Sequence, residues 1–113
     1  MLVRVPGSSA NLGPGFDALA LAVARHYELS DEPHDGFLPV PAGDLVWAAL
    51  GHTGASFERL WFRSRLPVGR GMGSSAAAAV AGAYLGYRTD GIDPIAARES
   101  AFSVAAEIEQ HPD

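Results

Sequence analysis

The chain has 113 residues, 48% of them hydrophobic, which is enough for one domain with a core and too few for two. Thirteen acidic and eight basic residues give a formal charge of −5, which argues against general nucleic-acid binding and against adhesion to anionic membranes. No cysteine is present, so disulfide frameworks and thiolate metal sites are excluded, and a cytoplasmic protein is expected. The longest apolar stretch, residues 76–87, is mostly alanine and shorter than the roughly 20 residues of a membrane span.

The first part of the chain is expected to form strands and loops. Alternation in residues 2–5 predicts a strand, and a loop of small and amide residues follows. Residues 18–29 fit a helix by their alanines or a buried strand by their alternating leucine and valine, and the strand is favoured because the alternation continues. Residues 30–44 hold acids, prolines and glycines and predict a loop with a short strand at 37–40.

A short helix and another strand are expected next. Asp44 is placed to cap a helix over residues 45–54, which ends at its glycines. Residues 57–66 alternate apolar side chains with arginines, which predicts a half-buried strand. That strand leads directly into the glycine-rich segment PVGRGMGSSAA, residues 67–77.

Two helices are expected to complete the chain. Ser74 and Ser75 are predicted to cap a helix over residues 76–87, and Asp93 to cap a second one with Pro94 in its first turn. The apolar positions of this second helix recur at helical spacing and are Ile95, Phe102, Ala105, Ala106 and Ile108. Strands followed by helices predict an α+β domain.

The glycine-rich segment can bind an anion. Gly69, Gly71 and Gly73 remove three β-carbons, and the helix that follows offers unpaired amide groups at its start. Those amides and the helix dipole favour a phosphate, and the serine hydroxyls add donors. The alternative is a plain turn followed by a helix cap, and a short GxGSS string alone favours that alternative. The segment is not a Walker loop, because no GK[ST] follows the glycines.

The longer string PVGRGMGSSAAAAVAG resembles the phosphate loop of the galactose, homoserine, mevalonate and phosphomevalonate (GHMP) kinases, P-x-x-x-G-L-G-S-S-A-A, with Met72 in place of leucine. Residues 5–22, VPGSSANLGPGFDALALA, resemble the N-terminal signature of the homoserine kinases within that superfamily. The terminal HPD resembles the start of their string EGHPDN, with Gln110 where glycine is usual. Three ordered motifs cover nearly the whole chain.

This resemblance implies a fold and a domain. It implies the ribosomal protein S5 domain 2-like fold, a mixed sheet with helices packed on one side. Residues 1–113 would form the N-terminal ATP-binding domain of a GHMP kinase whose C-terminal domain is absent. The charged, turn-prone ending EIEQHPD also leads us to expect that the sequence ends inside a larger protein.

The resemblance also implies which residues hold ATP and magnesium. The residues expected to hold the nucleotide are Pro67, Gly69, Arg70, Gly71, Met72, Gly73, Ser74, Ser75 and Ala76. Ser75 is also expected to ligate Mg²⁺, together with either Glu107 or Glu109. Glu107 fits the spacing from His111 better, although either glutamate can be an ordinary solvated helix residue, and Arg70 an ordinary solvated loop residue.

For the substrate, the resemblance points to the intact ANLGPGFD loop. Asp17 would pair with an ammonium group, Asn11 would donate and accept hydrogen bonds, and His111 would contact substrate. On loop chemistry alone, Asn11 and Asp17 would be turn residues and His111 an exposed side chain.

The implied reaction is ATP-dependent phosphorylation of L-homoserine, on the route to threonine. No general base is evident, so the resemblance implies direct attack by the hydroxyl, with Ser74 and Ser75 stabilising the transition state. A homodimer is expected of the full-length protein, and the isolated piece is expected to be inactive. The alternatives are another GHMP-type kinase for a small alcohol, and a truncated or degenerate relative that binds nucleotide or metabolite without turnover.

Overall fold

The computed structural model describes residues 1–6, 26–66 and 74–110. In chain order, its elements are β1 (Leu2–Pro6), β2 (His26–Ser30), β3 (Leu38–Pro39), α2 (Leu45–Leu50), β4 (Trp61–Ser64), α3 (Ser74–Thr89) and α4 (Pro94–Gln110). All the strands described precede the two long helices, which confirms the α+β class.

The four strands form one sheet in the order β1-β2-β4-β3, and every neighbouring pair is antiparallel. Val3 lies opposite Leu29, and Leu29 lies opposite Phe62, so these side chains share one face of the sheet. The expectation of a mixed sheet is therefore wrong for the strands described, because the chain reverses direction at each pairing.

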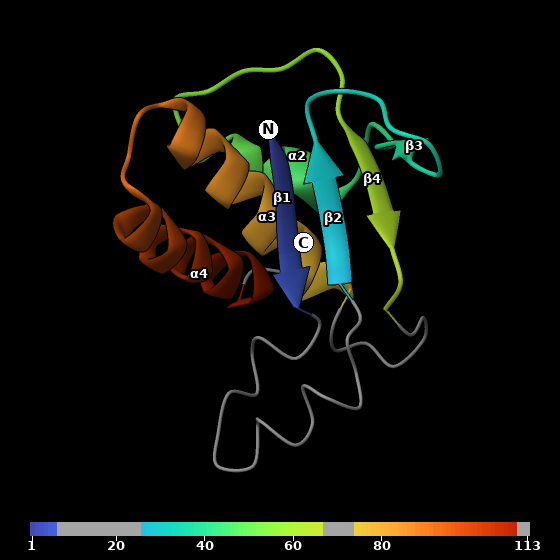
Figure 1. Ribbon diagram of the computed structural model, residues 1–113. Helices are drawn as coiled ribbons and strands as arrows, with labels where there is room; N and C mark the ends of the chain where they lie inside the picture. The colour runs from blue at the N-terminus through green and yellow to red at the C-terminus, as the bar shows by residue number, and fades with distance from the viewer. Residues whose placement is uncertain (7–25, 67–73, 111–113) are drawn as a thin grey trace.

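Figure 1 shows α2, α3 and α4 together on one side of the sheet. The side chains of Val3, Val5, Tyr27 and Leu29 are buried and share the face that these helices cover. Helix α3 packs against β1, β2, α2 and α4 and is the central helix of the layer. Its buried hydrophobic residues are Ala77, Ala78, Ala79, Val80, Ala81, Ala83 and Leu85. The core is thus a sheet face packed on an alanine-rich helix.

Two glycines let α3 approach α2 closely. A β-carbon at Gly82 would lie 2.6 Å from the carbonyl oxygen of Val46, which is backbone. At Gly86 a β-carbon would meet the side chains of Thr53 and Leu50. Because the two glycines are four residues apart, they lie on one face of α3 and let the two helices touch along it.

Both aspartate caps are confirmed. The side chain of Asp44 accepts a hydrogen bond from the Val46 amide at 3.0 Å, and that of Asp93 accepts from the Ile95 and Ala96 amides at 3.0 and 3.1 Å. Helix α2 ends at Leu50 rather than at residue 54. Within the described ranges, no helix has the length and apolar character needed to cross a membrane.

The strand predictions are confirmed in position, but two of them were too long, because residues 37–40 form a strand only at Leu38–Pro39 and residues 57–66 only at Trp61–Ser64. Residues 2–5 lie in β1, and the strand predicted over 18–29 is confirmed at His26–Ser30, while residues 18–25 lie outside the described residues. Leu60, just before β4, is buried, and its carbonyl accepts a hydrogen bond from the Val40 amide at 2.9 Å.

Two predictions about the long helices need correction. Helix α3 already begins at Ser74, so Ser74 and Ser75 form its first turn instead of capping it from outside. In α4, Ala105 is buried, and Phe102 and Ile108 are partly buried, as predicted, but Ala106 is exposed and Ile95 is 74% exposed. The buried face of α4 is made by Ala97, Ala101 and Val104, because small side chains allow close packing against α3.

Candidate active site

The two segments that carry the family motifs, residues 7–25 and 67–73, are attached to the same edge of the sheet. They are called the motif segments below. Strand β1 ends at Pro6, which pairs with His26 at the start of β2. Strand β4 ends at Ser64, which pairs with Tyr27, and the Arg65 amide donates to the His26 carbonyl at 3.1 Å. Because β1 and β4 are both antiparallel to β2, they run in the same direction. Residues 7–25 and 67–73 are therefore both connected at this edge.

The helices contribute to the same end of the molecule. In Figure 1, the start of α3 and the end of α4 lie near the edge where β1 ends and β2 begins. The first turn of α3 contains Ser74 and Ser75, and the last turn of α4 contains Glu107 and Glu109. The end of β1, the connection from β4 to the start of α3, and the end of α4 thus lie at one end of the sheet.

The start of α3 is suited to an anion. The helix has 16 residues, its first turn carries no acidic residue, and its last turn carries Arg88. The amides of a first helical turn have no partner inside the helix, and the helix dipole places partial positive charge there. Ser75 is exposed, so its hydroxyl is accessible, whereas Ala76 is partly buried.

Glu107 and Glu109 are both exposed. Being two residues apart, they lie about 200° apart around the helix, one on each side of its buried face. No described contact joins either carboxylate to Ser75. Among the residues that the structure describes, no three histidine, aspartate or glutamate side chains gather in a way that could hold a metal ion.

The remaining predicted site residues lie outside the described residues. They are Asn11, Asp17, Pro67, Gly69, Arg70, Gly71, Met72, Gly73 and His111. Their roles stay predictions, and only the points at which their segments join the sheet and the helices are known.

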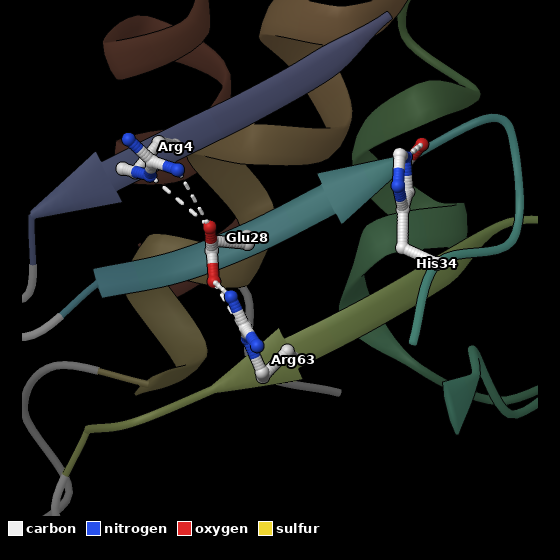
Figure 2. Close-up of polar contacts among 5 residues, drawn as sticks. Arg4, Glu28, His34 and Arg63 are labelled. Carbon is white, nitrogen blue, oxygen red and sulfur yellow. Dashed lines mark hydrogen bonds and ion pairs between the residues drawn. The ribbon is translucent and has the colours of Figure 1, made fainter. Parts of the chain in front are cut away.

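Sequence reasoning missed a charged cluster across three strands. Glu28, at the centre of β2, receives hydrogen bonds from Arg4 of β1 and from Arg63 of β4 (Figure 2). Burial alone would raise the pKa of the Glu28 carboxyl, but the hydrogen bonds and charges of Arg63 and Arg4 outweigh it and hold this pKa below its ordinary value. The only signal in the sequence was a glutamate inside the strand-like string HYELS.

A tyrosine on the opposite face of β2 is buried, as the alternation over residues 18–29 predicted, but its surroundings were not foreseen. The ring of Tyr27 stacks on that of Phe62, with centroids 5.8 Å apart, on the face that packs against the helices. Burial and, secondarily, the charge of Asp44 raise the pKa of its hydroxyl far above the ordinary value. Among the described residues, neither this hydroxyl nor Nε1 of Trp47 has a hydrogen-bond partner.

Residues 42–113, which include the glycine-rich segment and both long helices, match the model of the GHMP kinases N terminal domain. The chain belongs to the GHMP kinase family.

Curated relatives of this GHMP kinase chain are homoserine kinases. That of Clavibacter michiganensis subsp. michiganensis is 38% identical over 98% of the chain, and that of Halalkalibacterium halodurans is also 38% identical over 98%. The homoserine kinase of Streptococcus equi subsp. zooepidemicus is 36% identical over the whole chain. These alignments include the N-terminal motif, which precedes the part matched by the family model. No solved structure matches the chain.

The chain is much shorter than these relatives. It covers 41% of the Clavibacter and Halalkalibacterium enzymes and 43% of the Streptococcus enzyme. This GHMP kinase chain thus spans about two fifths of the length of the relatives that it matches.

Proposed function

We propose that residues 1–113 are the nucleotide-binding domain of an enzyme that transfers the γ-phosphoryl group of ATP to the hydroxyl of L-homoserine. One observation carries the proposal. The strands leading into the two motif segments run in the same direction and end at one sheet edge, beside the start of α3. A nucleotide held by one segment would therefore be near an alcohol held by the other.

The phosphates of ATP would lie at the start of α3. Its unpaired amides and dipole favour negative charge, and glycines in residues 67–73 let the backbone come close. Ser74 and Ser75 would add hydrogen bonds to the oxygens that gain charge in the transition state.

The amino acid would be held by the segment between β1 and β2. Asp17 would pair with the substrate ammonium, Asn11 would hydrogen-bond to its polar groups, and His111 would contact it from the end of α4. The substrate hydroxyl would then face the γ-phosphate.

A magnesium ion fits the oxygen donors available at this edge. The hydroxyl of Ser75 is exposed in the first turn of α3, and the carboxylates of Glu107 and Glu109 are exposed in the last turn of α4. Mg²⁺ prefers a few oxygen ligands combined with substrate phosphates, and Ser75 with one of these glutamates would supply them. When bound, the ion would neutralise charge on the phosphates.

The reaction would be a direct displacement. The homoserine oxygen forms a bond to the γ-phosphorus while the bond from that phosphorus to the bridging oxygen of ADP breaks. The hydroxyl proton leaves to solvent, because no side chain is assigned as general base. The products are O-phospho-L-homoserine, an intermediate on the route to threonine, and ADP. We place the enzyme in the cytoplasm, where ATP is available, and expect the full-length protein to be a homodimer.

The proposal is tested with the longest reading frame that contains this chain. ADP release is measured with L-homoserine, galactose or mevalonate, with and without Mg²⁺. Turnover that requires homoserine and Mg²⁺ is expected. Turnover only with another alcohol would indicate a different GHMP-type kinase, and ATP binding without turnover would indicate a non-catalytic relative.

Two variants test the assigned residues. Ser75→Ala is expected to lower kcat by about 10²-fold, the typical cost of one lost transition-state donor. Asp17→Asn is expected to raise the KM for homoserine by about 10-fold or more, because a charge-assisted hydrogen bond is lost. Ser103→Ala and Asp35→Asn, which change exposed residues elsewhere, are the matched controls and should behave like wild type. If both site variants keep wild-type kinetics, the site assignment is wrong.

A further inference from the structure

We infer that Glu28 is a positioning residue of the proposed kinase: it joins Arg4 and Arg63 across the sheet and thereby fixes the strand ends from which the two motif segments emerge. This inference rests on the proposed function. It concerns the described strands β1, β2 and β4 and assigns Glu28 no contact with substrate.

The three side chains lie in direct register. Arg4 is the cross-strand partner of Glu28, and Glu28 is the partner of Arg63. Nε and a terminal nitrogen of Arg4 lie 3.1 and 3.0 Å from one carboxylate oxygen, and the corresponding nitrogens of Arg63 both lie 2.8 Å from the other oxygen. One carboxylate thus holds a guanidinium on each side, as Figure 2 shows.

Glu28 lies on the sheet face that the helices do not cover, because its neighbours Tyr27 and Leu29 point to the helices. It is nevertheless only 4% exposed, since the two arginines cover it. Both of its oxygens are engaged and its pKa is lowered, so it is unsuited to accept a proton from substrate. Its chemistry is that of a structural anion.

The cluster lies close to the ends of β1 and β4. Pro6 is the last residue of β1 and lies opposite His26, the first residue of β2. Arg4 is two residues before Pro6, so the ion pair with Glu28 holds β1 close to the point where residues 7–25 begin. On the other side, Arg63 is three residues before Leu66, after which residues 67–73 begin.

Arg63 is itself held from a second direction. Its guanidinium lies over the ring of Phe37, 5.0 Å from the centroid. The ring of His34 is 5.2 Å from that of Phe37, and its Nε2 lies 3.1 Å from the hydroxyl of Ser30 in β2. The segment after β2 therefore folds back over Arg63 and orients it toward Glu28, so that loss of the carboxylate would free β1 more than β4.

The test compares kinetic constants of the full-length enzyme at a temperature where circular dichroism shows each variant to be folded. Glu28→Gln keeps the shape of the side chain but removes its charge, and we expect both KM values to rise, that for homoserine by about 10-fold and that for ATP by less, because small misplacements of binding groups are costly. Arg4→Met is expected to raise mainly the KM for homoserine, and Arg63→Met mainly that for ATP. A merely stabilising role would not produce this division between substrates.

Asp31→Asn is the matched control. It removes an ion pair with the Met1 amino group, 2.7 Å long, at the other end of the same strand pair, and should leave both KM values unchanged. The inference is overturned if Glu28→Gln keeps both KM values within twofold of wild type, or if the two arginine variants raise the same KM equally.

A second measurement does not depend on activity. Amide hydrogen exchange is followed in peptides covering the ends of β1 and β4, in wild type, Glu28→Gln and Asp31→Asn. Exchange at both ends should be faster in Glu28→Gln only, and unchanged exchange would overturn the inference. If wild type does not phosphorylate homoserine but this difference is seen, the proposed reaction is wrong while the role of Glu28 in holding the strands stands.

Discussion

The two faces of the sheet are stabilised in different ways. Toward the helices, Val3, Val5 and Leu29 pack against the small side chains of α3, and the backbones of α2 and α3 nearly touch at Gly82. On the other face, the contacts across β1, β2 and β4 are ionic and centre on Glu28. The first arrangement depends on shape and volume, and the second on charge.

This difference predicts what each face tolerates. A densely packed interface responds to a change of a single methylene group, whereas an ionic cluster responds to loss of charge and to pH. Substitutions on the helix side should therefore reduce the stability of the whole domain. Substitutions at the charged cluster should mainly alter how the strand ends are held.

The largest effect is expected on the helix side. Leu29 is 0% exposed, and Leu29→Ala should lower the free energy of unfolding by about 2–5 kcal/mol, since a cavity is left in the core. Leu38 of β3 is 63% exposed, and Leu38→Ala should change it by less than about 0.5 kcal/mol. Urea denaturation followed by circular dichroism measures both values. Equal losses would show that the helix face is not the main source of stability.

A smaller effect is expected from added volume between α2 and α3. Gly82→Ala should destabilise by about 1–3 kcal/mol through overpacking, partly offset by the better helix propensity of alanine. Its new methyl group would meet the backbone of Val46, which cannot move alone. Gly86→Ala should also destabilise, because its methyl group would meet the Thr53 hydroxyl, which is held by a hydrogen bond to the Leu50 carbonyl, and Gly43→Ala, with open space around it, is the control. A stabilised Gly82→Ala variant in thermal denaturation would contradict the close approach.

The smallest effect, and the only one that depends on pH, is expected at Glu28. Its folded-state pKa lies below its ordinary value of 4.5, so its ionised form stabilises the fold above that pH. This contribution should be lost as the pH falls below 4.5 through the folded-state pKa. The wild-type free energy of unfolding should therefore fall more steeply in this range than that of Glu28→Gln. If the two pH profiles are parallel, ionised Glu28 does not stabilise the fold, and the proposed role of its charge is wrong.

The sequence predicted local features of the fold well. Asp44 and Asp93 were recognised as caps because a cap depends on a few neighbouring residues, and Val3 and Val5 reveal one buried face by their spacing. The buried face of α4 was predicted less well. Ile95 is more hydrophobic than Ala97, yet Ala97 is buried and Ile95 is exposed. Which side of α4 is buried depends on how closely α3 packs against it, and the sequence pattern of α4 alone does not show this.

The residues of the candidate site were predicted mainly from family motifs. Only the preference of the start of α3 for an anion was predicted from residue chemistry. Glu28 escaped notice because its partners are 24 and 35 residues away in the sequence, and only strand pairing brings the three together. The motif segments were recognised because glycine, serine and amide residues in that order indicate phosphate and substrate loops, but which atoms they present depends on long-range contacts. Ser75 was predicted to cap α3 and instead lies in its first turn, where it is exposed.

The length of α3 has a practical consequence for labelling. With 16 residues at about 1.5 Å each, it separates its serine end from the turn between α3 and α4 by roughly 24 Å. That turn contains Ile92, which is 38% exposed, whereas Gly91 has a φ of 90°, which disfavours any side chain, and should be kept. A fluorophore or affinity tag introduced in this turn would report on the protein from the end of the helix farthest from the two motif segments.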